Sequence, residues 1–174
     1  MSKPLVSIVM GSANDWEVMQ QSARALQDFG VEFDARVISA HRSPDLLFDY
    51  IKDMTGQGVQ CFIAGAGGAA HLAGVVASFF PLPVIGVPIK SSALNGLDAL
   101  FSIVQMPPGV PVACVGINNA KNAALLAIQI LAASDKGLQK KVGEYKKKLA
   151  KIITEKNIKL NKIGIKKYLK GGKK

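Results

Sequence analysis

The sequence predicts an α/β protein, a three-layer sandwich whose five-stranded parallel sheet has the flavodoxin-like strand order 2-1-3-4-5. Two observations lead to this prediction. Short apolar runs alternate with stretches of helical periodicity through the first 134 residues, and the runs end in turns rich in glycine or serine. Such alternation indicates right-handed βαβ units and a parallel sheet covered on both faces. Five strands in one domain favour the doubly wound order.

The strands are expected where short runs are almost wholly apolar. Runs without polar alternation are typical of parallel strands that are buried on both faces. These runs lie at residues 5–10, 31–38, 59–64, 83–87 and 111–115.

The helices follow from apolar spacing and from capping residues. In the first, residues 15–29, apolar side chains recur every three or four positions, and Gly30 supplies a stop signal. The second begins at Ser43 and Pro44, which are typical of a cap and a first helical position, and it ends near Gly56. Further helices are expected at residues 69–79, 93–105 and 118–134.

The C-terminal segment has a different composition from the rest of the chain. Its apolar residues fall at alternating spacings of four and three, which predicts an amphipathic helix with lysines on its other faces. The stripe consists of Leu138, Val142, Tyr145, Leu149 and Ile152. We expect one domain, residues 1–156, that includes this helix, followed by a flexible lysine-rich tail, residues 157–174.

The positive net charge of +10 belongs to the C-terminal segment. Residues 1–135 hold 7 Lys and Arg against 10 Asp and Glu, whereas residues 136–174 hold 15 Lys against 2 Glu. Lysines without interleaved arginine or aromatic residues make weak, salt-screened contacts, so the charge argues against a nucleic-acid-binding protein. A nucleic-acid binder that acts through the tail stays open as an alternative.

The chain has the sequence features of a cytoplasmic protein that does not cross a membrane. No apolar stretch reaches the roughly 18 to 20 residues of a membrane span. The N-terminus lacks the charged and then apolar pattern of a secretory signal. Cys61 and Cys114 lie in apolar runs, which favours buried, reduced thiols over a disulfide or a metal site.

The candidate functional residues lie in the turns after the first three strands, because open parallel sheets bind ligands at the carboxyl ends of their strands. The first turn, residues 11–15, places Ser12 and Asp15 at a helix N-terminus. Free N–H groups and the helix dipole make such a turn an anion site. A plain helix cap without a ligand explains the same residues.

The second turn contains more residues of types that bind or react with a ligand than the first. Ser39, His41 and Arg42 lie within four residues at the start of a helix. Arginine can clamp a phosphate, serine can add a hydroxyl donor, and imidazole can both give and take a proton near neutral pH. We therefore single out His41 as a candidate acid–base catalyst, although a lone histidine is more often structural.

The third turn, residues 65–71, consists of small residues followed by His71. Ala66, Gly67 and Gly68 would let the backbone approach a small flat ligand. Close packing of a helix on a strand is the competing interpretation. The run is not a dinucleotide-binding fingerprint, which follows a first strand, and the sequence contains no recognisable metal-ligand cluster. We expect no cofactor and no metal.

These turns, together with residues 90–98 and 102–107, closely resemble the class I N5-carboxyaminoimidazole ribonucleotide mutases of bacterial purine biosynthesis. That family is also known as the catalytic subunit of phosphoribosylaminoimidazole carboxylase. The resemblance extends over about residues 5–135, and five motifs occur in the family's order.

The resemblance implies a cofactor-free octamer that moves a carboxylate from N5 of its ribonucleotide substrate to ring carbon C4. His41 would be the general acid and base. Ser12, Ser39 and Arg42 would hold the 5′-phosphate, and Asp15 would hold the ribose hydroxyls. The remaining substrate-binding residues, which would retain released CO2, would be Ala66, Gly67, Gly68, His71 and Leu72.

The sequence departs from the family's pattern at three places. Asn14 stands where the family usually has serine, and Ala73 stands where proline is frequent. The lysine-rich segment is the least typical part, and we expect its stripe, residues 138–152, to dock on a neighbouring subunit. Direct carboxylation of aminoimidazole ribonucleotide by free CO2 and a non-catalytic nucleotide-binding module stay as alternative functions.

Overall fold

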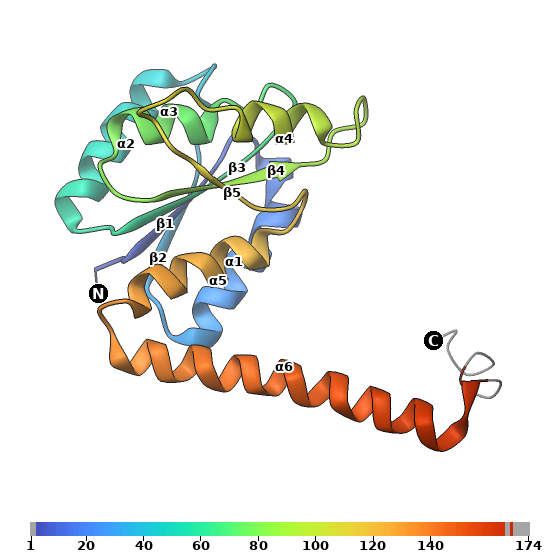
Figure 1. Ribbon diagram of the computed structural model, residues 1–174. Coiled ribbons are helices and arrows are strands. Elements are labelled where there is room, and N and C mark those ends of the chain that lie inside the picture. The colour runs from blue at the N-terminus through green and yellow to red at the C-terminus, as the bar shows by residue number, and fades with distance from the viewer. Residues whose placement is uncertain (1–2, 166–167, 169–174) are drawn as a thin grey trace. The chain divides into compact units, whose positions relative to one another are not determined.

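The computed structural model describes residues 3–165 and 168. The chain divides into two compact units, residues 1–131 and 132–174. The first unit is built on a parallel sheet of order β2-β1-β3-β4-β5, as predicted (Figure 1). The strands are β1 (Val6–Met10), β2 (Phe33–Val37), β3 (Cys61–Gly67), β4 (Val84–Ile89) and β5 (Ala113–Cys114).

Helices cover both faces of this sheet, which confirms the three-layer prediction. Figure 1 shows α2, α3 and α4 on one face and α1 and α5 on the other. The first face is covered by α2 (Pro44–Gln57), α3 (Leu72–Phe79) and α4 (Leu97–Val104). The second face is covered by α1 (Trp16–Phe29), which follows the short 3-10 helix η1 (Ala13–Asp15), and by α5 (Ala120–Ala132).

The third strand is longer than the sequence predicts. The prediction that this strand ends at residue 64 and that a turn begins at residue 65 is wrong, because β3 continues through Gly67 and pairs with β4 as far as Ile89. Gly68, at φ 63°, is the residue that turns the chain. The following helix accordingly begins at Leu72 rather than at residue 69.

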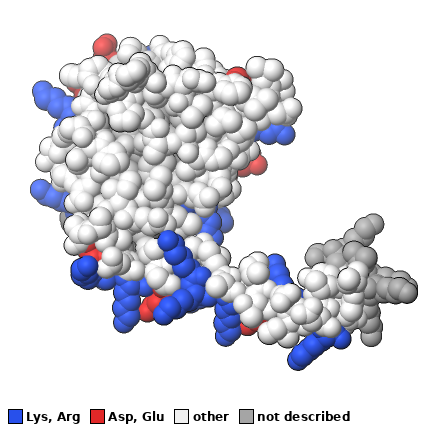
Figure 2. All heavy atoms as spheres, in the orientation of Figure 1, with Lys and Arg blue, Asp and Glu red and all other residues white. Residues whose placement is uncertain are grey.

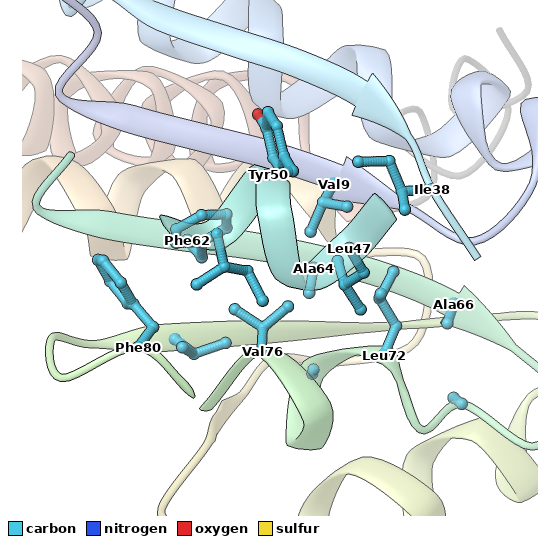
Figure 3. Packing of buried hydrophobic residues seen from close by; sticks show 14 of the residues in the cluster. Val9, Ile38, Leu47, Tyr50, Phe62, Ala64, Ala66, Leu72, Val76 and Phe80 are labelled. Atoms are coloured by element: carbon cyan, nitrogen blue, oxygen red, sulfur yellow. The ribbon is translucent and has the colours of Figure 1, made fainter. Parts of the chain in front are cut away.

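The core beneath α2 and α3 is closely packed around aromatic side chains. Phe62 of β3 lies edge-on to Phe80 and to Tyr50, with ring centroids 4.7 and 6.1 Å apart (Figure 3). The Tyr50 hydroxyl donates to Asp34 Oδ2 at 2.8 Å and lies 2.6 Å from the buried hydroxyl of Ser7. These bonds connect α2 to β1 and β2 and satisfy the buried polar groups, as a stable core requires.

Both cysteines are free thiols, as the sequence predicts. Cys61 is buried, and burial raises the pKa of its thiol to about 12. Cys114 is half-buried, and burial also raises its pKa. Because the thiolate is the reactive form, neither side chain has the character of a nucleophile.

The second unit contains one long helix, α6 (Lys136–Ile163). The Asp135 side chain caps it by accepting from the Leu138 backbone N–H at 3.0 Å. The helix continues past residue 156 into the segment expected to be a flexible tail, and the last residues of that segment lie outside the described part of the chain. Figure 2 shows lysine side chains gathered along α6. No helix of the described residues is long and apolar enough to span a membrane.

Gly86 of β4 is predicted to be essential for the packing of α4. A Cβ at this position would lie 2.4 Å from Ile103 Cγ2 and 3.2 Å from Val112 Cγ1. Gly86→Ala should therefore lower the free energy of unfolding by about 1–3 kcal/mol, measured by urea denaturation. The matched control is Gly56→Ala in α2, where a Cβ meets nothing within 4 Å. That change should be neutral or stabilise by up to about 1 kcal/mol.

Ile103→Ala tests the assigned cause. It removes the methyl group that the new Cβ would meet, so Gly86→Ala should cost less in the Ile103→Ala background than in the wild type. Equal costs in the two backgrounds would show that overpacking against α4 is not the cause.

Candidate active site

A pocket of about 470 Å³ opens at the carboxyl ends of β1 to β4. Because the strands are parallel, the turns that follow them meet at this edge of the sheet. Eight residues singled out from the sequence line the pocket, whereas Gly68 and His71 do not. The eight are Ser12, Asp15, Ser39, His41, Arg42, Ala66, Gly67 and Leu72.

The first turn is a capping box with a buried carboxylate. Ser12 Oγ accepts weakly from the Asn14 N–H at 3.4 Å, and Asp15 Oδ2 accepts from the Ser12 N–H at 2.9 Å. Burial raises the pKa of Asp15, and this effect is opposed by backbone hydrogen bonds from Ser12 and Gly11 and by the charge of Arg42. Ser12 and Asp15 therefore do cap the helix, and the same hydrogen bonds hold the Asp15 carboxylate in the pocket wall.

The second turn is tied to the first by Arg42. Its guanidinium Nη2 donates to the Gly11 carbonyl at 3.0 Å, and its backbone N–H donates to Ser39 Oγ at 3.2 Å. Ser43 occupies the expected cap position, but its hydroxyl bonds the Ser39 backbone instead of the helix. Serine hydroxyls and a guanidinium consequently converge where two helices begin, and the positive ends of the helix dipoles add to a site that suits a phosphate group.

His41 forms a hydrogen-bonded pair with His71, a contact that sequence reasoning missed. Nε2 of His41 lies 2.9 Å from Nδ1 of His71, and the rings meet at 81°. His71 is the N-cap of α3 rather than a residue inside the helix. One nitrogen of such a pair must donate and the other accept, so each ring fixes the tautomer of its partner.

The far wall of the pocket is made by β3 and by the segment after β4. At Gly67 a Cβ would lie 3.1 Å from the Ile89 carbonyl oxygen, so the glycine lets the two strands approach closely at the pocket edge. Lys90 and Ser91 also line the pocket, and neither is among the site residues predicted from the sequence. Their position directly after an apolar strand, at the same edge of the sheet, could have indicated that they line the pocket. Within residues 3–165 and 168, no group of three or more His, Cys, Asp or Glu side chains is arranged to hold a metal ion.

Comparison with known proteins identifies the family. The family model described as AIR carboxylase matches residues 5–152. The chain belongs to the AIR carboxylase family. The match includes every turn that lines the pocket and the first part of α6.

Relatives in this family resemble the chain over nearly its whole length. An N5-carboxyaminoimidazole ribonucleotide mutase of Thermotoga maritima is 54% identical, over 95% of this chain and 97% of its own. The mutase of Pyrococcus horikoshii is 53% identical, over 96% of this chain and 94% of its own. The crystal structure of Treponema denticola PurE aligns with a TM-score of 0.84 at 34% identity, over 90% of this chain and 98% of that one.

Asp15 is predicted to titrate above the ordinary aspartate pKa of 3.8, because desolvation outweighs its hydrogen bonds and the charge of Arg42. Between 3.8 and the raised pKa the folded chain binds more protons than the unfolded chain, so the free energy of unfolding falls as pH rises through this window. Carbon-13 NMR of the carboxyl group measures the titration directly.

Arg42→Gln provides the matched perturbation. Loss of the guanidinium charge should raise the pKa of Asp15 further, since that charge favours the carboxylate. A pKa of Asp15 at or below 3.8 in the wild type, or a fall in Arg42→Gln, would contradict the assigned balance.

Proposed function

We propose that this chain is an N5-carboxyaminoimidazole ribonucleotide mutase, an isomerase of purine biosynthesis that yields 4-carboxy-5-aminoimidazole ribonucleotide. The observation that carries the proposal is the His41–His71 pair, 2.9 Å apart, beside a pocket with an anion-binding end. The names of relatives at 53–54% identity support the same reaction.

The turns after β1 and β2 form the phosphate end of the proposed site. Ser12, Ser39 and Arg42 bind the 5′-phosphate, using hydroxyl donors, backbone N–H groups and one guanidinium. Asp15 accepts hydrogen bonds from the ribose hydroxyls. The Arg42 bond to Gly11 supports this assignment, because it holds the cation between the two turns before substrate arrives.

His41 moves one proton out and one proton back. As the bond between N5 and the carboxyl carbon breaks, its electron pair stays on nitrogen, which takes a proton from His41, and CO2 is released. Ring carbon C4 then attacks the CO2, and the proton lost from C4 returns to His41. The histidine ends in its starting state, so no cofactor is required. The hydrogen bond to His71 orients the His41 ring and determines which of its nitrogens carries the transferred proton.

Small residues retain the CO2 between the two steps. Ala66, Gly67 and Leu72 line the pocket without charge, and Gly68 and His71 lie next to them in the chain. Retention beside C4 makes recapture effectively intramolecular, which accounts for a large part of the rate.

We also propose that the enzyme is a cytoplasmic homo-oligomer, an octamer as the resemblance implies. Large apolar side chains on the sandwich face solvent in this single chain, which is typical of subunit interfaces. Phe48 and Phe79 are 46% and 54% exposed and form an edge-on pair, and Phe101 is 56% exposed. In α6, the exposed Leu149 and Ile152 belong to the stripe that would dock on a neighbouring subunit.

Direct carboxylation of aminoimidazole ribonucleotide by free CO2 is the second candidate, favoured by the family model's description as AIR carboxylase. Assays of both substrates, side by side, separate the two. We expect turnover of N5-carboxyaminoimidazole ribonucleotide without added bicarbonate. Activity confined to aminoimidazole ribonucleotide plus CO2 would overturn the mutase assignment.

His41→Asn is predicted to lower turnover by about 10²–10⁴-fold, because it removes the proton carrier. Binding of aminoimidazole ribonucleotide, measured by calorimetry, should change little. His71→Asn should have a smaller effect on kcat and should shift its pH profile, because it acts through the tautomer of His41. Full turnover in His41→Asn would exclude His41 as the proton carrier.

Phe79→Glu is predicted to reduce the size of the assembly, because it places a charge in an apolar interface. Light scattering after gel filtration should give an octamer for the wild type and smaller species for the variant. Phe79→Leu, which keeps the site apolar, should preserve the octamer. A monomeric wild type would contradict the proposed assembly.

A further inference from the structure

The segment that follows β4, residues 90–91, lines the pocket but takes no part in the reaction proposed above. Lys90 and Ser91 line the main pocket and also an adjoining hollow of about 400 Å³, which Asp15 and Asn118 help to line. The segment begins directly at the end of a buried strand, at the same sheet edge as the catalytic turns.

Three hydrogen bonds hold the backbone and the serine of this segment in place. The Lys90 backbone N–H donates to Asn118 Oδ1 at 2.8 Å, and the Asn118 N–H donates to the Pro88 carbonyl at 2.8 Å. Asn118 has a left-handed conformation, φ 58°, which asparagine tolerates better than most residues. Ser91 Oγ donates to Asp98 Oδ2 at 2.9 Å. The base of the lysine is thus fixed, while its side chain is exposed and can move.

The charges that line the pocket are divided between its two sides. Arg42 lies at the β1–β2 side, where it bonds the Gly11 carbonyl and lowers the pKa of Asp15. Lys90 follows β4, which is separated from β1 by β3, so its backbone lies two strand spacings, about 10 Å, from the end of β1. Across residues 3–165 and 168, Lys90 forms no ion pair. The pocket therefore contains a second cation that no described residue holds in an ion pair, although the Asp15 carboxylate lines the same two hollows.

We infer that Lys90 binds the carboxylate that the enzyme transfers. This role rests on the proposed function, in which substrate and product each carry two anionic groups, a 5′-phosphate and a carboxylate. Arg42 neutralises the first, and Lys90 is the remaining lysine or arginine of the pocket lining. A lysine suits a group that changes its point of attachment, because an ammonium on a flexible stem can follow it from N5 to C4.

Paired binding measurements test this inference. The ligands are 4-carboxy-5-aminoimidazole ribonucleotide and aminoimidazole ribonucleotide, which differ by the carboxylate, and the method is titration calorimetry. Lys90→Met should weaken binding of the carboxylated nucleotide roughly 10- to 100-fold, as expected for loss of a charged hydrogen bond. Binding of aminoimidazole ribonucleotide should change less than about twofold, since it lacks the carboxylate that Lys90 contacts. Lys90→Arg should retain most of the discrimination.

Control variants separate the possible outcomes. Lys52→Met, an exposed lysine of α2 outside the pocket lining, should alter neither affinity. Arg42→Gln should weaken both nucleotides, because both carry the phosphate. Equal effects of Lys90→Met on the two ligands, or no effect on either, would overturn the role of Lys90 while leaving the mutase assignment intact. If the wild type binds neither nucleotide, the proposed function fails, and the role of Lys90 fails with it.

Discussion

All five strands run in the same direction, and every part of the candidate site depends on this constraint. Parallel pairing brings the ends of β2, β1, β3 and β4 to one edge of the sheet, in that spatial order. Residues as distant in the chain as Ser12, His41, Gly67 and Lys90 therefore line one pocket. The Arg42 bond to the Gly11 carbonyl then fixes two neighbouring turns against each other. A change in the strand order would separate the residues that line the pocket.

The pocket is chemically divided along this edge. On the β1–β2 side lie hydroxyls, helix N-termini and a guanidinium, which suit a doubly charged phosphate. The middle, at Ala66 and Gly67, is small and uncharged. The His41–His71 pair lies between the second and third turns, and Lys90 closes the β4 side. This order suits the proposed substrate, with its phosphate on the β1–β2 side and its carboxylate between the small residues and Lys90.

Local patterns in the sequence were sufficient to predict the strand order and the positions of most elements. Apolar runs and capping residues such as Ser43-Pro44 are short-range signals, and the helix does begin at Pro44. The glycine run was misassigned, because composition alone favours a turn at Gly65–Gly68. Pairing with Pro88 and Ile89, which lie more than twenty residues away in the chain, keeps Ala66 and Gly67 in the strand.

Contacts between distant residues account for what the sequence could not predict. His41 and His71 are separated by 30 residues, and no local pattern shows that their ring nitrogens meet. The same holds for Lys90, which is held by Asn118 across 28 residues. Family resemblance could assign roles to matching positions, but only the fold shows which side chains share a pocket.

Transfer of a retained CO2 molecule is the central chemical claim, and isotope retention tests it most directly. Substrate labelled with carbon-13 in the N5-carboxylate would be converted in the presence of excess unlabelled bicarbonate, and the product would be analysed by mass spectrometry. The account predicts that nearly all of the label appears in the C4-carboxylate. Dilution of the label to the level of the bicarbonate pool would show that CO2 escapes and that the pocket does not retain it.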